Sequence, residues 1–492
     1  MRLQSLQIVF TCALSLAGAG CVLPDYTGAD GVCKQGSPWI RQIGSASIDI
    51  AFAASSDPCG GVTVGGGIQS TVKFDTEATL VADNKDLDGF VARFDGLGNN
   101  LWATLVGSSG QQFVSYVETD HFGNAVAAGS FVGTLSPGGS GAFTGEGDAT
   151  ASGSVTPDES DTREYSSFVT KLDLFGAPVW TRVFLGPKDM VSTTPCGLAV
   201  DRGGSITIAV NFMGQITIDG ATLTGEGDSS IFVAHYDEDG GLLWKKAFST
   251  PEGVECNSLA ADKDGNILMT GAYRSDIDFG GGPLAAPTAK QQFFVLKMGS
   301  DGDHVFSDKS LSGDALSGTA ITSDAKGNIF VAGSFFGQAD FGDGAVTANG
   351  FLDVFVQKRS PAGERQWTKT FSPSTKNLDN IGAVTTIRAD PSGNVLLGGT
   401  IVGELVLDQK LAAKSAADAF VARLNGSDGA PSVSRIFQAP GPQLLTGLAV
   451  DMEGFPIVAS WFTQSIDLGP GAGQLTADDN GFGTLYVAKL KL

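Results

Sequence analysis

The stretch GTAITSDAKGNIFVAGSFFGQADFGDGAVTANGFLDVFVQKRSPAGERQWTKTF, residues 318–371, decides the fold. It contains four short runs rich in β-branched and aromatic residues, at 319–323, 329–335, 353–358 and 366–371, and such runs are typical of strands. Tight turns are indicated between them by the Asp and Gly of 324–328 and the Pro and Gly of 360–363. We predict a four-stranded antiparallel sheet, which is too small to bury both of its faces alone.

The same unit recurs seven times along the chain. An Asp followed three residues later by Gly marks the turn after each first strand, at Asp57, Asp120, Asp201, Asp262, Asp324, Asp390 and Asp451. An aromatic residue followed by Val marks each third strand, at Phe90, Phe168, Phe232, Phe294, Phe355, Phe420 and Tyr486. The Asp residues are 61 to 66 positions apart, except for one interval of 81. A period of this size predicts a repeat architecture.

A large residue marks the fourth strand of each unit, and its first copy indicates how the repeats are joined. The markers are Trp39, Trp102, Trp180, Trp244, Phe306, Trp367 and, as a weak match, Val433. Trp39 precedes the first Asp, whereas no fourth strand follows the seventh aromatic strand. An N-terminal strand that completes the last blade would close a ring. We therefore predict an all-β fold, a seven-bladed β-propeller of four-stranded antiparallel blades, closed by that strand.

The predicted boundaries follow from these rows. Residues 1–20 are assigned to a signal peptide, 21–38 to a tether that carries a lipid anchor, and 39–492 to the propeller. The blades are placed at approximately 44–107, 108–186, 187–250, 251–311, 312–371, 372–437, and 438–492 together with 33–43.

The N-terminus has the pattern of an export signal. Arg2 provides the positive start, an apolar run follows at 8–16, and small residues occupy 17–20 directly before Cys21. This arrangement resembles a bacterial lipobox, in which the Cys receives lipid, although Gly18 stands where an aliphatic residue is usual. We expect lipidation at Cys21 and an outer-membrane lipoprotein of the bacterial cell envelope. Simple secretion after cleavage before Gly20 is the alternative.

The charge balance restricts the partners. Lys and Arg number 31 against 53 acidic residues, which gives a net charge of -22. Such a chain repels nucleic-acid backbones and anionic membranes, so neither is expected as a partner apart from membrane attachment through the lipid. We expect a monomer that binds another protein or a polysaccharide.

The repeat also resembles a known family. Its motifs are D-x-x-G-N, as at 324–328, an aromatic-Val strand that ends on a basic residue, as at 355–358, and G-x-x-x-W, as at 363–367. They are similar to the bacterial seven-bladed β-propeller repeat of exported proteins and lipoproteins, notably of myxobacteria-like bacteria. The resemblance covers about residues 39–492 and implies an envelope propeller without a transferable catalytic residue. Phe455 in place of Asn and Val433 in place of Trp depart from it.

Four cysteines follow Cys21, and an exported protein permits two disulfides. Cys196 and Cys256 precede first strands of adjacent blades, near the top of the channel. Cys33 precedes the closing strand and Cys59 lies in a first turn, so this pair would staple the seam. Free buried thiols are the alternative.

Metal and cofactor signals are weak. The carboxylates of 262–264 and 237–239 resemble fragments of calcium loops, yet equivalent turns without spare carboxylates occur elsewhere, so turn capping is the preferred interpretation and Ca²⁺ the alternative. His121, His235 and His304 occupy unrelated repeat positions, and no metal site is expected. His235 takes the place of a Lys or Arg in the other blades, which favours a surface role. No cofactor is predicted.

Two breaks in the repeat are the functional candidates. Blade 2 carries an acidic insertion within 134–167, which includes Glu146 and Asp148 and is expected on the top face. Glu118 and Arg388 replace small residues beside the inner strands, where they could line the axial channel or face local partners. The preferred function is a non-catalytic binding or scaffold module for a protein or glycan. The alternative is a secreted or surface hydrolase or lyase with an acidic top-face site.

Overall fold

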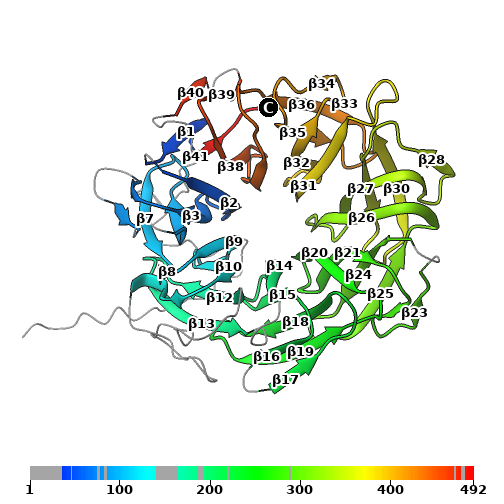
Figure 1. Cartoon of the computed structure of the whole chain (residues 1–492), viewed down its shortest axis with the longest axis horizontal. Helices are drawn as coiled ribbons and strands as arrows, with labels where there is room; N and C mark the ends of the chain where they lie inside the picture. The colour runs from blue at the N-terminus through cyan, green and yellow to red at the C-terminus, as the bar shows by residue number, and fades with distance from the viewer. Residues whose placement is uncertain are drawn as a thin grey trace, which may run out of the picture.

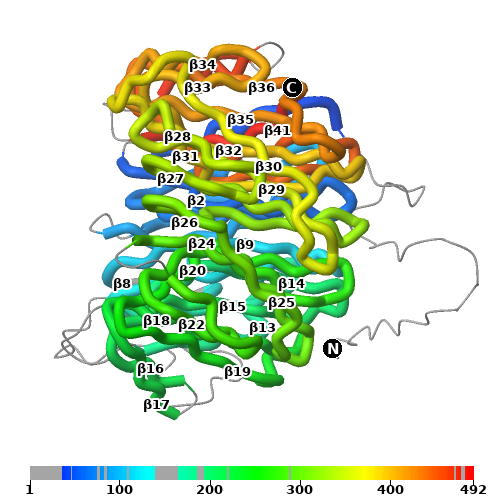
Figure 2. Tube along the Cα trace, turned by 90° about the vertical axis from the view of Figure 1, so that its right-hand side faces the viewer, coloured from blue at the N-terminus to red at the C-terminus, as the bar shows by residue number. Residues whose placement is uncertain are grey.

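A computed structural model describes residues 36–45, 47–74, 78–82, 86–139, 165–185, 193–218, 221–286, 290–469, 473–477 and 483–492. Seven antiparallel sheets, the blades, form a ring around one axis (Figure 1). Figure 2 views this ring from the side, where the strands run across its thickness. In the described part of the chain, no helix is long and apolar enough to cross a membrane.

Each blade uses its first strand on the inside and its fourth on the outside. Blade 1 has β2 (Asp49–Ser56), β3 (Val62–Ile68), β6 (Asp88–Phe94) and β7 (Asn100–Leu105); blade 2 has β9 (Gln112–Thr119), β10 (Ala125–Phe131), β12 (Ser166–Leu172) and β13 (Pro178–Phe184). Blade 3 has β14 (Thr194–Val200), β15 (Ile206–Phe212), β18 (Ser230–Tyr236) and β19 (Leu242–Phe248); blade 4 has β20 (Val254–Ala261), β21 (Ile267–Tyr273), β24 (Gln292–Met298) and β25 (His304–Lys309). Blade 5 has β26 (Ser312–Ser323), β27 (Ile329–Asp340), β29 (Asp353–Arg359) and β30 (Arg365–Phe371); blade 6 has β31 (Ile381–Ala389), β32 (Val395–Val402), β35 (Asp418–Leu424) and β36 (Pro431–Phe437). Blade 7 has β37 (Leu445–Val450), β38 (Pro456–Phe462), β41 (Thr484–Lys489) and β1 (Trp39–Ile43).

Short strands occupy the connections around the main sheets, which the sequence did not reveal because these segments are rich in Gly and polar residues. They are β4 (Thr71–Lys73) with β5 (Thr79–Val81), β8 (Gly107–Ser109) with β11 (Thr134–Leu135), β16 (Gln215–Ile218) with β17 (Ala221–Thr224), β22 (Ile277–Asp278) with β23 (Pro283–Leu284), β28 (Ala345–Thr347) on β27, β33 (Glu404–Val406) with β34 (Lys410–Ala412), and β39 (Ser465–Asp467) with β40 (Gln474–Thr476). A 3₁₀ turn covers Pro137–Gly139. In blade 5, β26 and β27 extend beyond the predicted runs because Ser312–Gly318 pairs with Gly333–Asp340 despite its polar composition. We call the face with the Asp turns the lower face, and the opposite one the upper face.

The predicted ring closure is confirmed. Strand β1 pairs antiparallel with β41, from Trp39 opposite Lys489 to Ile43 opposite Leu485. The fourth strand of blade 7 therefore comes from the opposite end of the sequence to its other three. The indole of Trp39 is 8% exposed and donates a hydrogen bond to the Gly96 carbonyl in blade 1, 3.1 Å away. The seam is thus held by a strand pair within blade 7 and by a side chain that reaches blade 1.

The same side-chain contact links other blades. Trp102, Trp180, Trp244 and Trp367 each donate the indole N–H to a carbonyl in the turn after the third strand of the next blade. A Gly closes that turn, and at Gly98, with φ of 79°, an added Cβ would lie 2.5 Å from the Trp39 ring. The G-x-x-x-W motif is therefore an inter-blade contact. Blade 7 has no such turn, because its third and fourth strands are not consecutive, and blade 6 accordingly carries Val433.

The repeated Asp residues cap their turns, as predicted. In blade 1, one carboxylate oxygen of Asp57 accepts the backbone N–H groups of Cys59 and Gly61, at 2.7 and 2.9 Å. The other oxygen pairs with the buried guanidinium of Arg93 in the third strand. Equivalent pairs join Asp120 to Lys171, Asp262 to Lys297, Asp390 to Arg423 and Asp451 to Lys489. In these five blades the capped turn is therefore joined to its own third strand by an ion pair.

This arrangement corrects the surface role predicted for His235. Its side chain is buried, with 2% exposure; Nδ1 lies 2.8 Å from Thr207 Oγ1, and the ring stacks on Trp244. Burial lowers the pKa of His235, against the opposing effect of Asp201. Blade 3 thus carries an imidazole ring where the other blades carry Lys or Arg. The sequence obscured this because long Lys and Arg side chains in a strand usually reach the surface.

Replacing Trp39 by Ala should weaken the seam. We expect the free energy of unfolding to fall by about 3 kcal/mol, because a buried indole and its hydrogen bond are lost. Val433→Ala is the matched control, since this residue has the same repeat position but no turn to contact, and it should cost about 1 kcal/mol or less. Urea denaturation followed by circular dichroism measures both. Equal losses in the two variants would contradict the proposed role of Trp39.

Replacing His235 by Gln should reduce the acid sensitivity of the fold. The unfolded chain accepts a proton near the ordinary His pKa of 6.5, whereas the folded pKa is lower. The folded state therefore binds fewer protons in this window, and the free energy of unfolding falls as the pH drops below about 6.5. Urea denaturation between pH 7 and 5 should show a shallower decline for the variant, which keeps the other histidines. Parallel pH profiles would contradict this expectation.

Candidate functional site

The axial channel contains a cavity of about 100 Å³ lined by residues from the inner strands of all seven blades. The strands β2, β9, β14, β20, β26 and β31 can be followed around the middle of the ring in Figure 1, and β37 completes the set. Because every blade contributes the same strand, a regular repeat would line the cavity with seven similar sets of residues. The departures from that regularity identify the candidate site.

A β-bulge occurs at the same place in every inner strand, five residues before the repeated Asp. The residues skipped in the pairing are Phe52, Ser115, Cys196, Asn257, Thr319, Thr385 and Thr446. Bulges redirect side chains and bend strands. Here they form a ring of seven positions toward the upper end of the channel.

Most of these bulged residues connect their blade to the next one. The hydroxyl groups of Thr319, Thr385 and Thr446 donate to carbonyls of Val384, Leu445 and Ala51, at 2.6, 2.6 and 2.7 Å. The amide of Asn257 donates to the Gly318 carbonyl at 2.9 Å. In each case the acceptor lies six residues before the next Asp. We call this set of contacts the inner belt.

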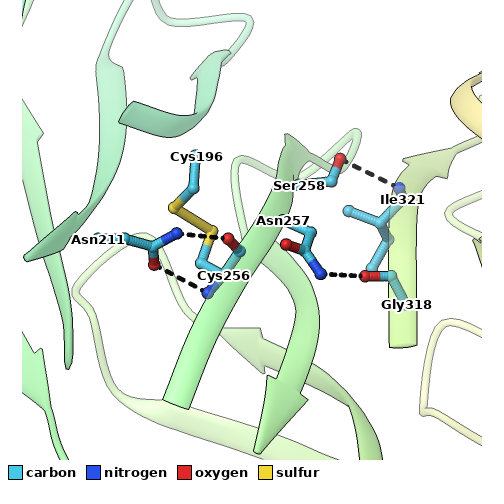
Figure 3. The surroundings of a disulfide bond; sticks show 7 residues. All are labelled: Cys196, Asn211, Cys256, Asn257, Ser258, Gly318 and Ile321. Atoms are coloured by element: carbon cyan, nitrogen blue, oxygen red, sulfur yellow. Dashed lines mark hydrogen bonds between the residues drawn. A yellow bond between two sulfur atoms is a disulfide. The ribbon is translucent and has the colours of Figure 1, made fainter. Parts of the chain in front are cut away.

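Between blades 3 and 4, a disulfide takes the place of the hydrogen bond (Figure 3). It joins Cys196, at the bulge position, to Cys256, at the acceptor position, with Cα atoms 5.7 Å apart. The side-chain amide of Asn211 donates to the Cys256 carbonyl and accepts its N–H. The disulfide is therefore a covalent member of the inner belt, with Asn257 beside it forming the next link.

The other predicted disulfide falls partly outside the described residues. Cys59 lies in the first turn of blade 1 and is disulfide-bonded. Its predicted partner, Cys33, lies outside the described residues, as does the lipidation candidate Cys21.

Blades 1 and 2 break the pattern with aromatic residues. Phe52 replaces the small or polar residues of the other bulge positions, and Tyr116, one position further along its unit, replaces Ala, Gly, Ser or Thr. Both line the cavity. The ring of Phe113 lies between those of Phe52 and Tyr165, with centroid distances of 6.0 and 5.8 Å. We call Phe52, Phe113 and Tyr165 the aromatic track, which runs from the channel toward the start of β12.

The prediction of channel residues rested on the position two residues before each Asp, where Glu118 and Arg388 stand, and so did not include these aromatics. Comparison of the positions four and five residues before each Asp would have identified Tyr116 and Phe52 as exceptions.

Burial raises the pKa of Tyr116 to about 12, so its hydroxyl keeps its proton throughout the neutral range.

Glu118 and Arg388 meet in the channel although they belong to blades 2 and 6. A guanidinium nitrogen of Arg388 lies 3.6 Å from a carboxylate oxygen of Glu118, and the two side chains are 32% and 30% exposed. The other Glu118 oxygen accepts a hydrogen bond from Ser55 at 3.0 Å. Burial raises the pKa of Glu118, while Arg388 and Ser55 act to lower it. This ion pair lies closer to the lower face than the bulged residues do. It therefore lies below the aromatic residues in the channel.

The remaining candidates lie in the blade 2 insertion and in two calcium-like turns. Glu146 and Asp148 lie outside the described residues. In the two calcium-like turns, carboxylate oxygens of Asp262 and Asp237 accept backbone N–H groups, as capping requires. Among the described residues, no group of three or more His, Cys, Asp or Glu side chains is arranged to hold a metal ion.

Comparisons with known proteins give no family and no function. No family model and no curated protein match the chain. Solved structures with some likeness include the β-propeller domain of the Trilobed protease from Pyrococcus furiosus, with 10% identity, a TM-score of 0.42, and 90% of this chain and 95% of that chain covered. Another is a protein of unknown function from Dyadobacter fermentans, with 12% identity, a TM-score of 0.41, and coverage of 76% and 93%. A third is quinohemoprotein alcohol dehydrogenase from Comamonas testosteroni, with 11% identity, a TM-score of 0.36, and coverage of 91% and 76%.

A double-mutant cycle tests the coupling of the channel charges. Arg388→Gln should destabilise the fold because Glu118 loses its charged partner, whereas the double variant with Glu118→Gln should lose less than the sum of the single changes. We expect a coupling energy of about 1 kcal/mol, measured by urea denaturation. Additive effects would show that the two side chains do not interact in solution.

Proposed function

We propose that this protein is a non-catalytic binding module of the bacterial cell envelope, which presents the upper mouth of its channel to a protein or a glycan. The ring is the rigid support, and the channel residues of blades 1, 2 and 6 form the recognition site. Recognition sites are commonly carried by segments held on a rigid scaffold. A propeller closed by β1 provides such a scaffold.

One observation carries the proposal: separate breaks in the repeat meet in one cavity. Phe52, Tyr116, Glu118 and Arg388 each occupy a position that is small or polar in most other blades, and all four line the same space. Packing alone requires none of them, because most other blades close their part of the ring with small or polar residues at these positions. A concave site on which a few aromatic and polar side chains converge is a common form of ligand site.

The composition of the cavity favours binding over hydrolysis. Glu118 is the only carboxylate among the described residues that line it, and Arg388 and Ser55 already engage both of its oxygens. Hydrolysis of glycosides commonly uses two carboxylates on opposite sides of the bond. The cavity supplies one, in an ion pair.

Attachment to the envelope rests on the N-terminal pattern. We propose that the chain is an outer-membrane lipoprotein anchored at Cys21, with the propeller acting as a monomer. Mass spectrometry of the mature N-terminal peptide tests the anchor. A diacylated or triacylated Cys21 is expected, whereas an unmodified N-terminus at Gly20 would contradict the anchor and leave a secreted protein.

The binding site can be tested by restoring the repeat. We expect Phe52→Thr combined with Tyr116→Ala to weaken capture of envelope material at least tenfold in biolayer interferometry against separated glycan and protein fractions. The matched control is Phe175→Ala, which removes an aromatic residue that is 74% exposed on the lower face of blade 2. Equal capture by the restored variant, the control and the native protein would overturn the channel as the site.

A further inference from the structure

We infer that the ligand of this channel is the end of a neutral, hydroxyl-rich glycan chain, whose sugar rings lie on the aromatic track. The inference rests on the proposed function and names the chemical class that the same site selects. It is carried by three properties of the site: its aromatic surfaces, its hydrogen-bonding groups and its charge.

The aromatic track supplies surfaces for the apolar faces of sugar rings. Phe52, Phe113 and Tyr165 follow one another with centroid distances of 6.0 and 5.8 Å, and the Tyr165 hydroxyl donates to Gln111 at 2.6 Å, which fixes the outer ring. All three side chains remain partly exposed. A pyranose ring has C–H groups on its faces and hydroxyl groups around its edge, so it can lie against an aromatic ring while its edge stays hydrated. Aromatic side chains present large, rigid apolar surfaces that are suited to such contacts.

The cavity beyond Phe52 is rich in hydrogen-bond acceptors. Three hydroxyl groups already donate hydrogen bonds to carbonyls of the inner belt, those of Thr319, Thr385 and Thr446. Their oxygens can therefore only accept hydrogen bonds from a ligand. The Glu118 carboxylate adds further acceptors. A ligand that enters can therefore donate to these oxygens, as sugar hydroxyl groups do.

The paired charges of the cavity favour neither cationic nor anionic ligands. Arg388 opposes an ammonium group that would otherwise be attracted to Glu118 and the aromatic faces, and Glu118 opposes an anion. The net charge of -22 adds to the repulsion of anionic polymers. A donor-rich ligand without charge satisfies both limits.

The volume indicates how the glycan is placed. A cavity of about 100 Å³ is well below the ~300–1,000 Å³ of pockets that enclose a whole small ligand, so it accommodates only part of a terminal sugar. The following sugars would then lie on Phe113 and Tyr165, outside the cavity. The site thus binds the end of a glycan chain rather than its interior.

The test uses the mature chain and uncharged, acidic and basic oligosaccharides of similar length. Neutral glucan, mannan and galactan oligomers should bind in isothermal titration calorimetry, and oligogalacturonate and chitosan oligomers should bind at least tenfold more weakly. Phe113→Leu, which keeps apolar bulk but removes the ring, and Tyr165→Ala should each weaken neutral binding about tenfold, or 1.4 kcal/mol. Phe175→Ala should leave it unchanged. Circular dichroism confirms that each variant is folded.

Arg388→Gln gives a second, opposite readout. It frees Glu118, so affinity for the chitosan oligomers should rise at least fivefold while the neutral ligands lose affinity. Neutral oligomers that fail to bind, or that bind equally well to native protein and Phe113→Leu, would overturn the inference. If an envelope protein were then captured in a manner that depends on Phe52, the proposed function would stand without the glycan. If neither were captured, both would fall.

Discussion

The structure depends on the antiparallel pairing of Trp39–Ile43 with Leu485–Lys489. A four-stranded blade cannot bury both of its faces, so each blade needs a neighbour on either side. Six junctions join blades that are consecutive in sequence, and the seventh joins blade 7 to blade 1. Because β1 completes blade 7 and directly precedes blade 1, unfolding at the seam requires loss of a strand pair and not only of side-chain packing. Closure in this way leaves no blade exposed to other chains.

Two sets of contacts join neighbouring blades, one near the outside of the ring and one near its axis. Near the outside, an indole or phenyl ring lies on the turn glycine of the next blade. Near the axis, the inner belt connects the bulges, and in one junction the Cys196–Cys256 disulfide replaces the hydrogen bond. The two cysteines are 60 residues apart in sequence, so the cross-link contributes about 4 kcal/mol in the chain-entropy model. The same bulges turn Thr and Asn side chains toward the channel, so the contacts that hold the ring also shape the cavity.

The sequence predicted the architecture well because the period, the turn residues and the displaced Trp39 are all local signals. It predicted the inner position of Glu118 and Arg388 from their contrast with small residues, but not that blades 2 and 6 bring them within 3.6 Å. Burial of His235 was missed because a strand pattern does not show that the next blade covers it. Phe52 and Tyr116 were missed for a different reason, since the signal was present at repeat positions that were not compared. The bulges have no sequence signature beyond their constant distance from the Asp.

A regular ring explains the fold, and its irregularities in blades 1, 2 and 6 mark the proposed ligand site. Hydrogen–deuterium exchange with and without a bound neutral oligosaccharide tests whether these irregularities form the site. We expect added protection in 50–53 and 112–118, at the inner strands of blades 1 and 2, and in 385–388 of blade 6, with no change in the Asp turns of the lower face. Protection confined to those turns or to the outer strands would contradict it.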